Sequence, residues 1–267
     1  MKFNLMILTA DPSFAVKSQL AGIDRIFYDL EYINKRERQA GRNTVVSDNK
    51  VDGIPSVKKV LASADLLVRV NPIHQYSCTE IDQSIENGAD ILMLPMVIDS
   101  SDVRSFVNMV AGRAKTCIMI ETPQAMTRID SILEVEGIDE LFFGLNDLHI
   151  GLGLKFMFET LSGGLIEYMA QKCKMKGMSF GFGGIARIGD GILPADNILG
   201  EHIRLGSSSV ILSRTFKDEI VQDGEIILSR EVKKVREKIA EIETWSQEQF
   251  EINRRQVVMA VKKITNS

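Results

Sequence analysis

Short runs of apolar residues recur through residues 1–215, separated by polar stretches of helix length. Most runs are apolar at nearly every position, as in Ile91–Leu94, and do not alternate between apolar and polar residues. Such runs are typical of strands buried on both faces of a parallel sheet that helices cover. We therefore predict eight strands: Phe3–Thr9, Arg25–Leu30, Asp65–Val70, Asp90–Pro95, Cys117–Thr122, Glu140–Leu145, Met178–Phe182 and Ser208–Ser213.

Helix signals occupy the segments between these runs. Ser100–Asp102 precedes apolar residues at helical spacing, and Pro123 lies near a helix start, where its missing N–H costs little. Eight strands that alternate with helices predict a (β/α)8 TIM barrel, with an open doubly wound sheet as the alternative.

The pattern changes after residue 228. Apolar residues in Val232–Ile242 step by three and four, and no proline or glycine follows to the C-terminus. This spacing predicts one long helix or two. We divide the chain into a barrel at residues 1–228 and a C-terminal helical arm at residues 229–267. The arm is either a last barrel helix with a frayed tail or, as we favour, an element that packs on another subunit.

Composition excludes several classes of protein. The 267 residues are 45% apolar and 25% charged, as in ordinary globular proteins. No apolar run reaches the roughly 20 residues that cross a bilayer, and the N-terminus lacks the features of a signal peptide. A net charge of −4 argues against a nucleic-acid or anionic-membrane surface. Three cysteines without a CxxC pair fit a reducing cytoplasm.

Polar residues lie at the carboxyl ends of several of the predicted strands, where a TIM barrel forms its active site. The second strand ends in Asp29 and Glu31, the third in Arg69 and Asn71, the fifth in Glu121, and the sixth in Asn146 and Asp147. Glu121 and Asp147 are placed to share a divalent cation, and carboxylate oxygens suit Mg²⁺ or Mn²⁺. The alternative for each is a carboxylate that caps a helix.

Arg69 interrupts the apolar run Leu67–Val70, and a buried charge needs a partner. That partner is either Asp29 or Glu31, in a structural ion pair, or the carboxylate of a substrate. The two acids are then groups that orient the arginine.

Other chemistries have weaker signals. Gly181–Ala186 matches G-x-G-x-x-A, but a dinucleotide site should open the first βαβ unit of a fold, and this match lies in the seventh repeat. We expect a loop there, which either approaches an anionic ligand or simply turns. No predicted strand carries a lysine near its carboxyl end, which disfavours a Schiff-base aldolase.

Four segments, in order, resemble a known family: Leu67–Pro72, Ala89–Val97, Ile118–Pro123 and Phe142–Leu148. Together they are similar to the class II pyruvate aldolases and citrate lyase β-subunits of the phosphoenolpyruvate/pyruvate barrel superfamily. The resemblance extends from Arg25 to Arg214, which is most of the barrel.

The resemblance implies a divalent metal, Mg²⁺ or Mn²⁺, held at Glu121 and Asp147. It also implies that Arg69 binds the oxygen that becomes an enolate, and we add Asp29 and Glu31 to the catalytic set. The backbone around Gly144–Leu145 is implied to meet the substrate carboxylate. The substrate-binding set is therefore Arg69, Asn71, Gly144, Leu145 and Asn146.

Two positions depart from the family pattern. Tyr32 follows the acidic pair where the aldolases carry a histidine base, and Met119 stands where they carry glutamine. Metal-bound water or a substrate group is then left to take the hydroxyl proton.

We accordingly expect a divalent-metal-dependent carbon–carbon lyase of the aldolase type, acting on a small 2-oxo acid such as pyruvate or oxaloacetate, or on its aldol adduct. One alternative is other enolate chemistry on a phosphorylated or acyl-thioester substrate, with Gly181–Gly184 and Arg214 binding the anionic group. The other is a catalytically silent barrel used for binding or assembly. We expect a cytoplasmic homo-oligomer joined through its C-terminal helices, as the resemblance implies, with no nucleic-acid or membrane partner.

Overall fold

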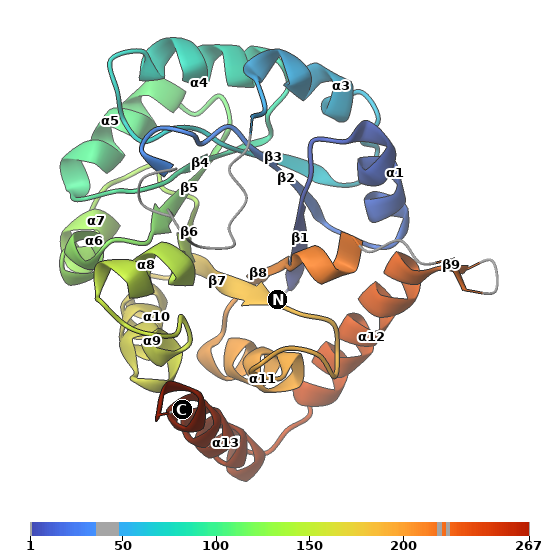
Figure 1. The fold of residues 1–267 in the computed structure, drawn as a ribbon. Coiled ribbons are helices and arrows are strands. Elements are labelled where there is room, and N and C mark those ends of the chain that lie inside the picture. The colour runs from blue at the N-terminus through green and yellow to red at the C-terminus, as the bar shows by residue number, and fades with distance from the viewer. Residues whose placement is uncertain (1, 36–47, 218–220, 223–224, 267) are drawn as a thin grey trace.

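The computed structural model is a closed barrel of eight parallel strands with helices around it (Figure 1). It describes residues 2–35, 48–217, 221–222 and 225–266. Each strand pairs with the next, and the eighth pairs with the first, so the sheet closes on itself. The strands are β1 Asn4–Leu8, β2 Arg25–Asp29, β3 Asp65–Arg69, β4 Ile91–Leu94, β5 Lys115–Ile120, β6 Glu140–Phe143, β7 Ser179–Ile185 and β8 Ser209–Leu212. The TIM barrel is confirmed and the open sheet is wrong.

Helices follow the strands on the outside of the barrel. After β1 to β4 they are α1 Pro12–Leu20, the 3-10 turn η1 Val51–Gly53, α3 Ile54–Lys58, α4 Ser77–Glu86 and α5 Ser100–Val110. After β5 and β6 they are α6 Pro123–Thr127, α7 Ile129–Leu133, α8 Leu145–Gly151, α9 Glu159–Ser162 and α10 Leu165–Met175. After β7 and β8 come α11 Ala195–Leu205, η2 Arg214–Lys217, the short strands β9 Val221–Gln222 and β10 Glu225–Ile226, α12 Ile227–Ile242 and α13 Gln247–Asn266.

Each of the eight predicted strands overlaps an observed one, but the glycine-rich segment was predicted wrongly. Residues 181–184 belong to β7 and are not a loop, and the pairing with β8 shifts in register between Gly181 and Gly184. A Cβ at Gly181 would collide with the Ser209 side chain, so glycine here lets two strands pack closely. The predicted sixth strand is also too long, because β6 ends at Phe143 and α8 begins at Leu145.

The strand pleat determines which residues enter the barrel. The interior holds an apolar cluster of Met6, Phe27, Leu67, Ile91, Met93, Cys117, Met119 and Phe142. Because side chains two residues apart in a strand share a face, Asp29 follows Phe27 on that face, Arg69 follows Leu67, and Glu121 follows Met119. The same alternation that builds the core therefore brings these charged residues to one end of the barrel.

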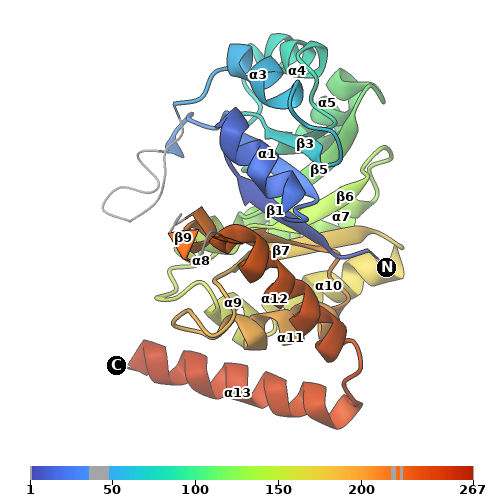
Figure 2. The same cartoon turned by 90° about the vertical axis from the view of Figure 1, so that its right-hand side faces the viewer.

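The C-terminal segment forms two helices rather than one. α12 packs between α11 and α1 and completes the ring of barrel helices, so the predicted boundary at residue 228 falls inside a barrel helix. α13 then crosses α11 and α9 of the same chain (Figure 2). Asn253 fastens it there, because its Nδ2 donates to Glu201 Oε1 and to the Asn197 carbonyl, both at 3.1 Å. The separate arm domain and the subunit interface stay predictions.

Among the described helices, none is long and apolar enough to cross a membrane.

Candidate active site

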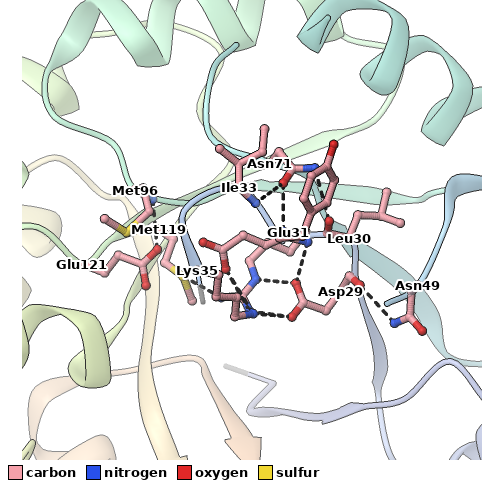
Figure 3. A network of polar contacts seen from close by, with 12 residues as sticks. Asp29, Leu30, Glu31, Ile33, Lys35, Asn49, Asn71, Met96, Met119 and Glu121 are labelled. Carbon is pink, nitrogen blue, oxygen red and sulfur yellow. Dashed lines mark hydrogen bonds and ion pairs between the residues drawn. The ribbon is translucent and has the colours of Figure 1, made fainter. Parts of the chain in front are cut away.

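Charged side chains meet at the carboxyl ends of β2, β3 and β5 and near the first turn of α8. They are Asp29, Glu31, Lys35, Arg69, Glu121 and Asp147. Figure 3 shows four of them, Asp29, Glu31, Lys35 and Glu121, facing one another. All five of the predicted catalytic and metal-binding residues belong to this group, and the sixth member, Lys35, was not predicted.

Arg69 is held by Asp29, the last residue of β2, and by Glu31, two residues later. Its Nε donates to Asp29 Oδ1 and its Nη2 to Asp29 Oδ2, each at 2.8 Å, and Nη2 lies 3.3 Å from Glu31 Oε2. Burial alone would raise the pKa of Asp29, but the charges of Arg69 and Lys35 outweigh it and bring the pKa to about 2. The predicted ion pair therefore exists, and a two-pronged contact of this kind fixes the guanidinium plane.

The third nitrogen of Arg69 has a different environment. Nη1 contacts the Met119 sulfur at 3.6 Å, and a thioether is a weak acceptor. The glutamine that the aldolases carry at this position would be a strong acceptor. Met119 thus leaves Nη1 with hydrogen-bonding capacity for a ligand, while Phe27 lies under the guanidinium with its ring centre 5.2 Å from Cζ.

Lys35 places a second cation beside the same two acids. Its Nζ donates to Asp29 Oδ2 at 2.7 Å and lies 3.2 Å from Glu31 Oε2, with only 4% of its side chain exposed. Lys35 lies six residues beyond the end of β2, past the strand end at which a lysine of a barrel active site is expected. Its four-residue spacing from Glu31 was the signal that could have identified it.

Asn71 organises the segment that follows β2. Its Oδ1 accepts from the Tyr32 and Ile33 amides at 2.9 and 3.1 Å, and its Nδ2 donates to the Leu30 carbonyl and to Glu80. These bonds use both donors and both acceptor positions of the amide. Asn71 therefore orients the chain around Glu31, and its predicted contact with substrate stays a prediction.

Glu121 is buried at the end of β5. Its Oε1 accepts at 3.0 Å from the amide of Met96, a residue with a φ of 55°. A left-handed backbone conformation is uncommon for residues other than glycine. At Met96 it directs the backbone N–H at the carboxylate of Glu121. Burial and the charges of Glu31 and Asp147 raise the pKa of Glu121 to about 8, even though Arg69 opposes them.

Glu121 and Asp147 are the donors that a divalent cation would use. The described residues contain no cluster of three or more histidine, cysteine, aspartate or glutamate side chains suited to a metal ion. Proteins nevertheless usually bind Mg²⁺ through one or two carboxylates and leave its other coordination positions to water and substrate. The repulsion that raises the pKa of Glu121 is also what a cation would relieve, so the residues present fit such an ion.

The backbone at Gly144, Leu145 and Asn146 adjoins this pair at the start of α8. A Cβ at Gly144 would lie 2.6 Å from Glu121 Oε2, so this glycine provides the space that Glu121 occupies. The predicted contact of this backbone with a substrate carboxylate stays a prediction. Arg214, proposed for an anionic group, begins η2 after β8.

We expect Gly144→Ala to fold but to bind metal more weakly. The φ of −83° suits alanine, whereas the new methyl group collides with Glu121 and must displace it. A misplaced ligand group typically costs about 10- to 100-fold in metal affinity. Calorimetric titration with Mn²⁺ measures the effect, and an unchanged affinity in a folded variant would show that Glu121 is not a ligand.

A barrel that gathers acidic and basic side chains at the carboxyl ends of its strands has the form of a (β/α)8 enzyme. Residues 2–162 match the family model described as HpcH/HpaI aldolase/citrate lyase, and the chain belongs to this family. The resemblance to aldolases and citrate lyases is therefore confirmed.

Two aldolases are among the similar proteins. The chain is 21% identical over 215 residues to 4-hydroxy-4-methyl-2-oxoglutarate aldolase of Chaetomium globosum, covering 67% of this chain and 73% of that protein. It is 36% identical over 77 residues to hydroxypyruvate/pyruvate aldolase of Rhizorhabdus wittichii, covering 26% and 31%. An HpcH/HpaI aldolase structure from Desulfitobacterium hafniense has a TM-score of 0.63 at 17% identity over 92% of this chain and 95% of that one. This last likeness shows the fold.

Proposed function

We propose that the protein is a divalent-metal-dependent carbon–carbon lyase that cleaves the aldol adduct of a small 2-oxo acid and releases pyruvate or a close analogue. The observation that carries the proposal is the position of Arg69. Two carboxylates fix its guanidinium, Nη1 has a thioether as its one partner among the described residues, and Glu121 is near enough for each group to shift the pKa of the other.

Aldol cleavage requires positive charge at one oxygen. When the bond between the two halves of the adduct breaks, its electron pair moves onto the carbonyl oxygen of the 2-oxo acid as an enolate. The hydroxyl group of the other half gives its proton to water or to a substrate group and becomes a carbonyl, and the enolate then takes up a proton at carbon. An N–H of Arg69 that points at the enolate oxygen stabilises the negative charge more strongly as it develops, which lowers the activation free energy of cleavage. A cation held by Glu121 and Asp147 would act on the same oxygen as a Lewis acid.

The ion pairs of Arg69 also serve the reaction. Asp29 and Glu31 prevent the guanidinium from turning toward solvent, so its orientation is set before the substrate arrives. Burial opposes the charge of Arg69, but the two acids raise its pKa above the usual range and keep it ionised. A fixed, permanently charged donor is suited to an oxygen whose charge appears only during the reaction.

The relatives support the class of substrate. Both aldolase names refer to 2-oxo acids or to pyruvate. We therefore choose 4-hydroxy-4-methyl-2-oxoglutarate, whose cleavage gives two molecules of pyruvate, together with simpler 4-hydroxy-2-oxo acids.

The test is release of pyruvate from these adducts, followed by a coupled lactate dehydrogenase assay. We expect cleavage with Mg²⁺ or Mn²⁺, loss of cleavage with EDTA, and recovery when excess metal is returned. Cleavage at an equal rate in EDTA would contradict the role of the metal. If none of these adducts is cleaved while metal is bound, the proposed lyase activity is contradicted.

A further inference from the structure

We propose that Lys35 is a positioning residue of the active site, which shares the charges of Asp29 and Glu31 with Arg69 and so leaves Arg69 able to bind an anionic substrate. The inference rests on the proposed function in one respect, namely that Arg69 is the group that meets the substrate.

The first support is the way the two cations share the two acids. Asp29 Oδ2 lies 2.8 Å from Arg69 Nη2 and 2.7 Å from Lys35 Nζ. Glu31 Oε2 lies 3.3 Å from the same guanidinium nitrogen and 3.2 Å from the same ammonium. Each of these oxygens therefore lies between the two positive groups, and Arg69 and Lys35 share both acids.

The second support is that the chain holds Lys35 in place. Its amide donates to the Tyr32 carbonyl at 3.2 Å, in a turn whose next residue, Ile33, is bound by Asn71. Asn34 within this turn has a φ of 57°, a conformation that asparagine tolerates better than most residues. These hydrogen bonds hold the backbone of the turn so that the Lys35 ammonium lies in the buried site.

The third support is the charge that a substrate would meet. Among the described residues, Lys35 and Arg69 are the cations within 3.3 Å of Asp29 and Glu31, so loss of Lys35 makes the surroundings of Arg69 more negative. Glu121 lies beside Arg69 and Glu31 and is acidic as well. An anion that approaches Arg69 Nη1 would then be bound less tightly, because charges at a buried site are weakly screened.

Tyr32 does not offer an alternative source of charge or of proton transfer at this place. It occupies the position of the aldolase histidine, yet 61% of it is exposed. Lys35 is the described residue after β2 that brings a titratable side chain back to Asp29 and Glu31.

The experiment compares Lys35→Gln, which removes the charge but keeps a polar head, with Lys35→Arg, which keeps the charge. The probes are Mn²⁺ alone and oxalate at a fixed Mn²⁺ concentration, both followed by calorimetry. We expect Lys35→Gln to weaken oxalate binding about tenfold or more and to bind Mn²⁺ as tightly as the wild type or more tightly, because the site becomes more negative. Lys35→Arg should keep oxalate affinity within about threefold on the same electrostatic ground.

The opposite responses to a cation and to an anion distinguish this role from a merely structural one, since local unfolding would weaken both. Should Lys35→Gln fail to fold, Lys35→Ala with added methylammonium replaces it, and the amine should restore oxalate binding. Unchanged oxalate affinity in Lys35→Gln would overturn the inference, as would absence of rescue in a folded Lys35→Ala. If Arg69→Met also keeps oxalate affinity, the proposed function fails; if only the Lys35 variants do, this inference alone fails.

Discussion

Replacing Arg69 with methionine is expected to reduce oxalate affinity by about 100-fold or more, because the ligand loses a charged donor and approaches the carboxylates of Asp29 and Glu31, which have lost the charge of Arg69. Oxalate is a suitable probe, since its planar dianion resembles the enolate of pyruvate. The free energy of unfolding should fall by about 3 kcal/mol, as expected when one partner of a buried ion pair is removed. Calorimetry and urea denaturation measure the two effects separately.

Arg69→Lys is the matched control for this substitution. It keeps the positive charge but cannot bind Asp29 through two nitrogens in one plane. We expect it to recover most of the stability and little of the oxalate affinity, because the amine has no counterpart to Nη1 fixed by its neighbours. Wild-type oxalate affinity in Arg69→Met would exclude Arg69 from the substrate site.

Replacing Glu121 with glutamine is expected to reduce Mn²⁺ affinity by at least about 100-fold, because the buried carboxylate is one of only two proposed protein ligands. Glutamine has nearly the same shape and can still accept the hydrogen bond from the Met96 amide. The fold should therefore survive. Because this substitution also removes the repulsion with Glu31 and Asp147, stability should be unchanged or slightly higher.

Asp147→Asn tests the second ligand in the same titration, and Asp82→Asn is a control on an exposed acid of α4 that pairs with Arg113. The control should bind Mn²⁺ as the wild type does. Equal affinity in Glu121→Gln and the wild type would move the metal site elsewhere.

The barrel could be predicted from the sequence because its strands are apolar on both faces and so stand out as continuous runs. The site could be predicted for the same reason. Asp29, Arg69 and Glu121 interrupt or end such runs, and the rule that barrel enzymes use the carboxyl ends of their strands then places them together. Both inferences depend only on local sequence and on one property of the fold.

What escaped prediction depends on contacts between distant segments. Lys35 lies on a turn that Asn71, far along the chain, binds. The glycines of β7 resemble a loop in sequence, yet Gly181 is required by the close approach of Ser209 in the next strand. The break between α12 and α13 occurs without proline or glycine, and beyond it Asn253 attaches α13 to α11 through Glu201.

We propose that the protein forms an enolate with the help of Arg69 and a metal at Glu121 and Asp147. Incubation of the protein with pyruvate in deuterium oxide tests this, with deuterium entry into the methyl group followed by nuclear magnetic resonance. We expect exchange with Mg²⁺ or Mn²⁺ and its loss in EDTA, in Glu121→Gln and in Arg69→Met. Exchange that is equally fast without metal, or no exchange with metal bound, would contradict it.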